Sequence, residues 1–152
     1  MKFTSEVEFD DKALRRYISR LKKMEAYEVE YGYYVEDKHP QSGDPMSKVA
    51  ITNEEGLGVI RRPFMHFTNT SMVIHYRRDK KWQDDVNAYL ENGGRIDTLY
   101  KKFGQEGKRQ VKAVIEAGQF EVTTNPTPLD DTGYMKNNAK VKVVKKGGSV
   151  EN

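Results

Sequence analysis

Cysteine and long apolar runs are both absent from this chain of 152 residues. Without cysteine the chain can form no disulfide scaffold, no thiolate zinc site and no cysteine nucleophile. No stretch approaches the roughly 18 consecutive apolar residues that a membrane-spanning helix needs. The first six residues also turn acidic where a signal peptide would carry its apolar segment. We therefore expect neither a membrane contact nor a secretory leader.

Bulky apolar residues are scarce, since leucine, isoleucine, valine and phenylalanine together make up 32 of the 152 residues. This share lies just above the roughly 20% below which a chain tends to be disordered. The 26 basic and 23 acidic residues leave a net charge of +3, which is weak for a dedicated nucleic-acid binder. The length suits one domain. We expect a single domain over residues 1–145 with a small core, followed by a flexible, glycine-rich tail over residues 146–152.

The first half of the chain contains both helical and strand periodicity. Helical spacing of apolar residues predicts an amphipathic helix over residues 11–25. Tyrosine and valine then alternate with charged or small residues, which predicts a half-buried strand over residues 27–35. Residues 37–46 contain two prolines and a glycine among polar residues and are expected to form an exposed loop. A short helix over residues 49–55 should end at Gly56.

The second half is expected to be helical until a final strand. Apolar residues at helical spacing around Trp82 and Leu90 predict a helix that ends at Gly93. Residues 96–117 predict two helices with a break near Gly104, because glycine interrupts the apolar pattern there. Alternating valine and lysine predict a strand over residues 138–145. The expected fold class is α+β, with a small antiparallel sheet packed by the N-terminal helix and several central helices.

No constellation of residues favours an enzyme. Asp131-Thr132-Gly133 matches the catalytic triplet of aspartic proteases, but only one copy exists and a turn is the preferred interpretation. The three histidines do not offer the i, i+4 spacing of helical metal ligands, and no phosphate-binding loop is present. We expect no catalytic residues, no metal and no cofactor.

Several basic clusters leave a nucleic-acid contact open as an alternative. Arg61-Arg62, Arg77-Arg78, Lys101-Lys102 and the lysines of the last strand could face phosphates, although acidic residues interleave with the middle clusters. The tyrosines of residues 27–34 could stack on bases, but their alternation favours a core or a subunit interface. A small nucleic-acid-binding protein therefore remains the second interpretation, and a dimeric aspartic protease the third.

Three ordered segments resemble the neck and tail-completion proteins of tailed bacteriophages. The first is the tyrosine-rich strand with the following short helix that ends in Asn53-Glu54-Glu55-Gly56. The second is the step Arg62-Pro63-Phe64. The third joins residues 114–120 to residues 128–135, which contain the turn Asp131-Thr132-Gly133 and end at Met135 before the last strand. The resemblance covers about residues 27–145, and it differs from the family pattern in a shortened stretch between Phe120 and Pro128.

The resemblance implies a non-enzymatic virion protein of the phage neck, at the head–tail interface, that is present in the host cytoplasm during assembly. Its expected partners are further copies of itself in a ring, with six as the expected number, and the adjacent connector and tail-terminator or tail-tube proteins. Such a ring forms through heterologous contacts between copies. A sequence-independent DNA contact is also expected to be possible.

Three sets of residues are the candidate sites. The turn and anchor residues are Arg62, Pro63, Phe64, Asp131, Thr132 and Gly133. The candidate docking loop contains Asp37, His39, Pro40, Gly43, Asp44 and Pro45. The candidate DNA-facing residues are Lys140, Lys142, Lys145 and Lys146.

Overall fold

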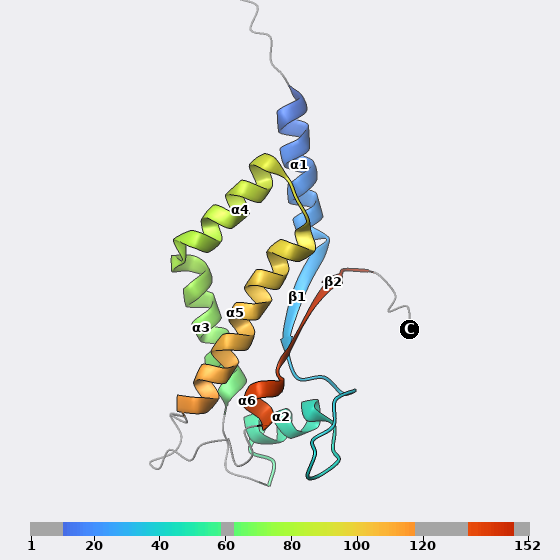
Figure 1. Cartoon of the computed structure of the whole chain (residues 1–152), viewed down its shortest axis with the longest axis vertical. Coiled ribbons are helices and arrows are strands. Elements are labelled where there is room, and N and C mark those ends of the chain that lie inside the picture. Colours follow the sequence, from blue (N-terminus) through green and yellow to red (C-terminus); the bar gives the residue numbers. More distant parts are fainter. Residues whose placement is uncertain (1–10, 59–62, 118–133, 148–152) are drawn as a thin grey trace, which may run out of the picture.

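A computed structural model describes residues 11–58, 63–117 and 134–147 (Figure 1). The elements along the chain are α1 (Asp11–Glu25), β1 (Tyr27–Gly32), α2 (Met46–Glu55), α3 (Phe64–Arg78), α4 (Lys80–Asn92), α5 (Ile96–Ala117), α6 (Tyr134–Asn138) and β2 (Lys140–Lys145). Helices dominate and the strands form one small antiparallel sheet, so the predicted α+β fold class is confirmed.

The sheet joins two strands that lie far apart in the sequence. Tyr27 of β1 pairs with Lys145, and Gly32 pairs with Lys140 at the other end of the register. α5 packs across both strands, while α1 meets the sheet only at the start of β1. The pairing of an early and a late strand, expected from their two alternating patterns, is confirmed.

The predicted break near Gly104 is wrong, because α5 continues without interruption from Ile96 to Ala117. Gly104 and Gly107 are buried inside this helix, on the side that faces the sheet. A Cβ atom on Gly104 would lie 2.2 Å from Val141 Cγ1, and a Cβ atom on Gly107 would lie 2.6 Å from the Tyr31 ring. These glycines allow the helix to approach the sheet closely instead of ending the helix.

Other boundaries differ from the expectations by a few residues. β1 ends at Gly32, whose φ of 138° few other residues adopt, so the predicted strand over 27–35 is three residues too long. The predicted last strand over 138–145 begins at Lys140 instead, because α6 occupies the positions before it. α2 begins at Met46, earlier than predicted, and ends as expected at Gly56 in the left-handed conformation.

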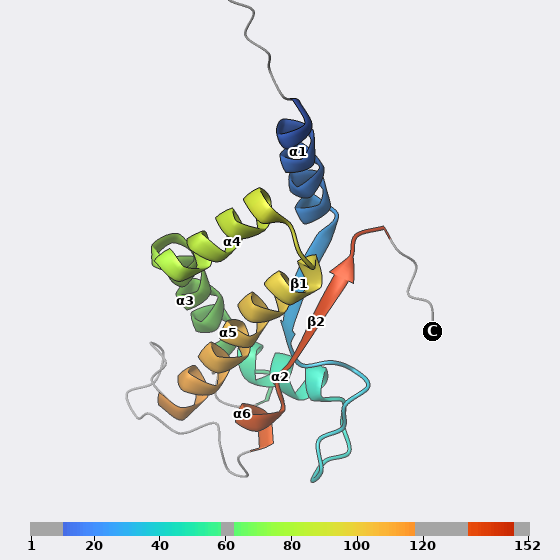
Figure 2. The same cartoon turned by 45° about the horizontal axis from the view of Figure 1, so that its top comes forward.

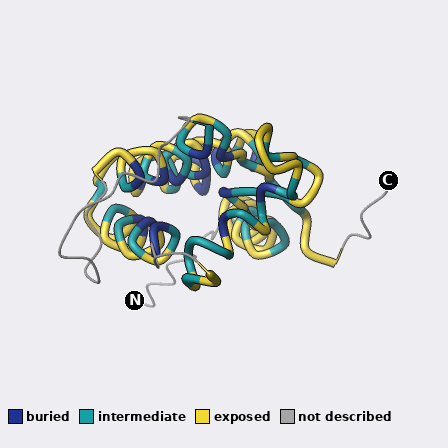
Figure 3. Tube along the Cα trace, turned by 90° about the horizontal axis from the view of Figure 1, so that it is seen from below, coloured by how far each residue is buried: buried dark blue, intermediate teal, exposed yellow. Residues whose placement is uncertain are grey.

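The described residues contain two hydrophobic clusters. The first, which we call the motif core, contains Met46, Ala50, Phe64, Val111, Ile115, Met135 and Ala139. The second contains Trp82, Tyr89, Leu90, Ile96 and Leu99, with Met24 and Phe103 packed against it. Figure 3 shows the buried positions turned toward the interior and the exposed ones outward.

α1 stands apart from both clusters over most of its length. Its upper part lies clear of the other elements in two views (Figures 1 and 2). Every residue from Lys12 to Ser19 is exposed. Only the end of the helix is held, since the Arg20 guanidinium donates to the carbonyls of Leu90 at 2.8 Å and Glu91 at 2.7 Å. These carbonyls lie at the C-terminus of α4, where no intrahelical donor is available.

Candidate functional site

The candidate docking loop has a defined fold. The His39 amide donates to the Asp44 carbonyl at 2.8 Å, and the Met46 amide donates to the Asp37 carbonyl at 2.7 Å. A bridge between Lys38 and Pro45 closes the loop at its base. The sequence indicated an exposed, proline-bounded loop, and the structure shows that its backbone groups are paired like those of a short hairpin.

Ion pairs fasten the residues next to this loop to β2. Lys140 contacts the Asp37 carboxylate, and Lys142 contacts the Glu36 carboxylate. The Lys142 ammonium also lies 3.7 Å from the centre of the Tyr34 ring, a cation–π contact. The hydrogen bond to Asp37 raises the pKa of Lys140. Burial, followed by the nearby charge of Glu30, raises the pKa of Tyr34 to about 12.

This arrangement changes how the candidate DNA-facing lysines can act. Lys140 and Lys142 have carboxylate partners, so their charge is already balanced on the surface of the protein. Lys145 and Lys146 are exposed and make no ion pair with any residue that the structure describes. A phosphate contact at this strand would depend mainly on Lys145 and Lys146. DNA contact itself stays a prediction.

Acidification is expected to loosen the contacts of the loop with β2 and α2. The hydrogen bonds from Lys142 to Glu36 and from Lys48 to Asp44 hold the pKa values of both carboxyls below their ordinary 4.5 and 3.8. A pKa that folding lowers contributes stability above the unfolded value, and that contribution is lost as the pH falls through the folded value. Amide exchange over residues 36–45, corrected for its intrinsic pH dependence, should accelerate a few-fold between about pH 5 and pH 3.

A Glu36→Gln variant provides the control for this measurement, because its side chain does not titrate. It should show the faster exchange already at neutral pH and a smaller change on acidification. Amides of α5 report whether the whole fold is opening. Equal exchange of the loop at both pH values in the unaltered protein would contradict the prediction.

Pro63 and Phe64 are the two turn and anchor residues that the structure describes, and both are buried. Pro63 precedes α3, with φ of −77°. Phe64 is fully buried and meets the Tyr33 ring edge-on at 6.0 Å between centroids. Arg62, Asp131, Thr132 and Gly133 lie outside the described residues, so the aspartic-protease triplet and the proposed turn are not placed. The positions of Pro63 and Phe64 match the expected roles of helix entry and core anchor.

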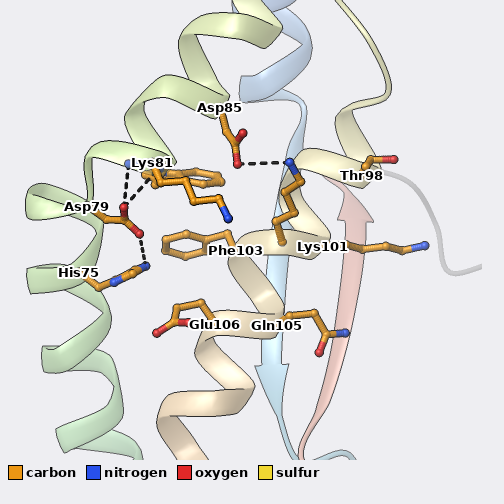
Figure 4. A pocket seen from close by; sticks show the side chains of 11 residues that line it. His75, Asp79, Lys81, Asp85, Thr98, Lys101, Phe103, Gln105 and Glu106 are labelled. Carbon is orange, nitrogen blue, oxygen red and sulfur yellow. Dashed lines mark hydrogen bonds and ion pairs between the residues drawn. The ribbon is translucent and has the colours of Figure 1, made fainter.

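A cavity of about 610 Å³ lies between the α3–α4 corner and α5 (Figure 4). Trp82 and Phe103 form its aromatic part, with ring centroids 4.8 Å apart. In its polar part, His75 Nε2 lies 2.9 Å from an Asp79 carboxylate oxygen. The remaining polar lining residues are Lys81, Asp85, Thr98, Lys101, Lys102, Gln105 and Glu106.

The charged groups of the cavity mainly stabilise the surrounding helices. Asp79 accepts hydrogen bonds from the amides of Lys81 at 2.8 Å and Trp82 at 3.3 Å, which caps the start of α4. Lys102 pairs with Asp85 at 3.2 Å and joins α4 to α5. Among residues 11–58, 63–117 and 134–147, no group of three histidine or carboxylate side chains is placed to hold a metal ion.

Removing this cap is expected to destabilise the protein. Asp79→Ala leaves the first amides of α4 without a side-chain acceptor and should lower the free energy of unfolding by about 1 kcal/mol. Asp79→Asn keeps an acceptor of similar capping strength and should recover most of that loss. Urea denaturation of the three proteins measures the difference. Equal stability of Asp79→Ala and the unaltered protein would show that the cap contributes nothing.

Sequence reasoning missed this cavity, although part of its signal was available. His75 and Asp79 are four residues apart, and Asp79 stands directly before a helix rich in polar residues. That pattern predicts a capped helix start, but not the approach of Phe103 from α5. The contact between Trp82 and Phe103 depends on how two helices pack, which spacing along the chain does not reveal.

Comparison with known proteins finds no relative for this chain. No family model, curated protein or solved structure matches it. Across the part of the chain that the structure describes, no helix is both long and apolar enough to cross a membrane.

Proposed function

We propose that this chain is a structural protein of the neck of a tailed bacteriophage, which joins the portal side of the head to the tail as a ring of identical copies. The supporting observation is where the residues of the family resemblance lie. Ala50 belongs to the short helix, Phe64 to the Arg-Pro-Phe step, Ile115 to the third segment and Met135 to the end of the last turn. All four contribute to the motif core.

The position of these four residues in the motif core favours an architectural role over a catalytic one. Residues shared with a family for catalytic reasons usually gather around a pocket, whereas residues shared for architectural reasons gather in the core. The resemblance therefore concerns the architecture of a subunit, as suits a protein that assembles. Its activity would be association with its own copies and with neighbouring neck or tail proteins.

The folded docking loop is the surface that we assign to a neighbouring protein. Residues 40–43 at its tip are exposed, backbone groups at its base are paired, and ion pairs hold its flank against β2. A loop held in one conformation loses little entropy on binding. Replacing residues 39–44 with two glycines should leave the core intact, because the bond from the Met46 amide to the Asp37 carbonyl remains.

The test disrupts the coding sequence in the phage or prophage that carries it. We expect filled heads and separate tails in electron micrographs, with infectious titre reduced at least a thousandfold. The unaltered chain supplied in trans should restore joined particles, and the chain with the shortened loop should not. Normal joined particles without the protein would overturn the proposed function. Full rescue by the shortened chain would overturn the role of the loop alone.

A further inference from the structure

We propose that the exposed apolar stripe of α1 binds the outer face of α2 on a second copy of this chain, and that this head-to-tail contact builds the ring. This proposal rests on the proposed function, because it names the contact that would join the copies of the proposed ring. The structure supports it through three independent features: an uncovered helix, a matching surface at the far end, and opposite charges on the two.

The stripe consists of Leu14, Tyr17, Ile18 and Leu21, whose spacing places them on one face of α1. Their exposed fractions are 47%, 37%, 42% and 40%. The stripe continues along the helix to Met24, which packs against the second hydrophobic cluster. One end of the apolar face is therefore anchored in the core while the rest has no cover within the described residues.

A helix so little covered would gain stability from a partner. Isolated helices of about 12–15 residues are marginal in water, and α1 has 15 residues. The Arg20 contacts to α4 fix only the last turns. The remainder projects about 15 Å at the helical rise. A firmly based, projecting helix with an apolar stripe has the form of an element that fits into a neighbour.

The matching surface lies on α2, at the opposite end of the molecule from α1 (Figures 1 and 2). Ile51 on its outer face is 56% exposed, and Leu57 just beyond its end is 62% exposed. Glu55 is exposed one turn after Ile51. Because the two surfaces lie at opposite ends, one copy cannot cover its own stripe, and each copy offers one surface to each neighbour.

The charges of the two ends identify the occupant as a second copy. α1 carries six basic and two acidic side chains, a net charge of +4. α2 carries Lys48, Glu54 and Glu55, a net charge of −1. Glu36 and Asp37 of the preceding segment are not counted, because Lys142 and Lys140 already pair with them. Like ends repel each other and unlike ends attract, so the charges oppose an α1–α1 dimer and favour the head-to-tail contact.

Because the chain lacks cysteine, disulfide crosslinking provides a clean test. Three full-length chains are prepared at high concentration: Ile18→Cys, Ile51→Cys and the double variant. The double variant should give a ladder of crosslinked species under oxidation, and an equal mixture of the single variants should give dimers. Each single variant alone should stay uncrosslinked. Dimers from Ile18→Cys alone would indicate paired α1 helices and overturn the proposal, as would the absence of any crosslink.

A second measurement uses substitutions that keep the helix. Leu14→Ser together with Ile18→Ser should weaken self-association at least about a hundredfold by sedimentation, because two apolar side chains lose their burial. Ser19→Gln, on the opposite face, is the control and should leave it unchanged. Circular dichroism confirms that the fold persists. Unchanged association of the serine variant, or binding of α1 to anionic vesicles in place of a second copy, would overturn the proposal.

The outcomes separate this contact from the proposed function. Ring formation that survives the serine variant, with heads and tails still unjoined when the protein is missing, would refute the α1–α2 contact and leave the neck function standing. Normal joined particles in the complete absence of the protein would refute the neck function, and crosslinked ladders would then still establish the head-to-tail contact.

Discussion

Replacing Phe64 with alanine is expected to lower the free energy of unfolding by about 3–5 kcal/mol. The side chain is fully buried in the motif core and packs edge-on against Tyr33. Its removal loses apolar burial and leaves a cavity that rigid neighbours cannot fill. Because a domain has only about 5–15 kcal/mol of net stability, the variant should be close to unfolding at physiological temperature. Urea denaturation followed by circular dichroism gives the value.

The control for this substitution lies on the same helix. Val73 of α3 is 52% exposed, and Val73→Ala should change stability by less than about 0.5 kcal/mol. The comparison separates the effect of burial from any general effect of alanine in α3. If the two variants lost equal stability, Phe64 would not be the anchor of the core.

The second large effect is expected at Gly104, where a larger side chain should lower the free energy of unfolding. Gly104→Ala would favour the helix by about 1 kcal/mol if propensity alone acted. The added Cβ would instead lie 2.2 Å from Val141 Cγ1 and 2.8 Å from Val29 Cγ2, far inside van der Waals contact. α5 must then move away from the sheet. We expect a net loss of about 1–3 kcal/mol, the usual cost of overpacking, measured by urea or thermal denaturation.

A compensating substitution tests the cause of this loss. Val141→Ala removes Cγ1, the methyl group nearest to the new Cβ. The double variant should therefore be more stable than the sum of the two single effects by about 1 kcal/mol. Gln105→Ala, at an exposed neighbouring position of α5, should be nearly neutral. A stabilising effect of Gly104→Ala would show that propensity outweighs packing.

Gly104 also shows a feature that could not be predicted from the sequence alone. A glycine inside a helical pattern has two physical meanings: an end of the helix, or a close approach by another element. Gly93 and Gly104 interrupt similar apolar patterns, yet Gly93 ends α4 with a positive φ and Gly104 lies within α5. Only the position of Val141, thirty-seven residues later in the chain, distinguishes the two. Local spacing contains no such information.

Elements with strong periodicity were predicted well. The helix over residues 11–25 agrees with α1 at both ends, since its apolar stripe and its charged faces are regular. The pairing of the two strands followed from their similar alternation. By contrast, α6 has five residues and no apolar repeat, so nothing in the sequence distinguishes it from the start of the last strand.

The candidate surfaces were predicted only in part. Residues 40–43 of the predicted loop are exposed, whereas Met46 at its end is buried and begins α2. The ion pairs with β2 were not foreseen, because Glu36 and Lys142 are more than one hundred residues apart. The alternation of valine and lysine located the last strand, in which Lys140 and Lys142 are exposed. Their carboxylate partners depend on which segment lies beside the strand, and this is a property of the whole fold.

The order of the strands along the chain bears on folding during synthesis. β1 leaves the ribosome more than one hundred residues before β2, its hydrogen-bonding partner. Until then its edge is open, and a nascent chain with an open edge can join another. Glu28 and Glu30 lie exposed along β1, where their like charges repel a second copy of the same strand. When β2 is added, Lys142 takes the register position opposite Glu30. We therefore expect Glu28 and Glu30 to reduce aggregation through the open edge of β1 before β2 is synthesised.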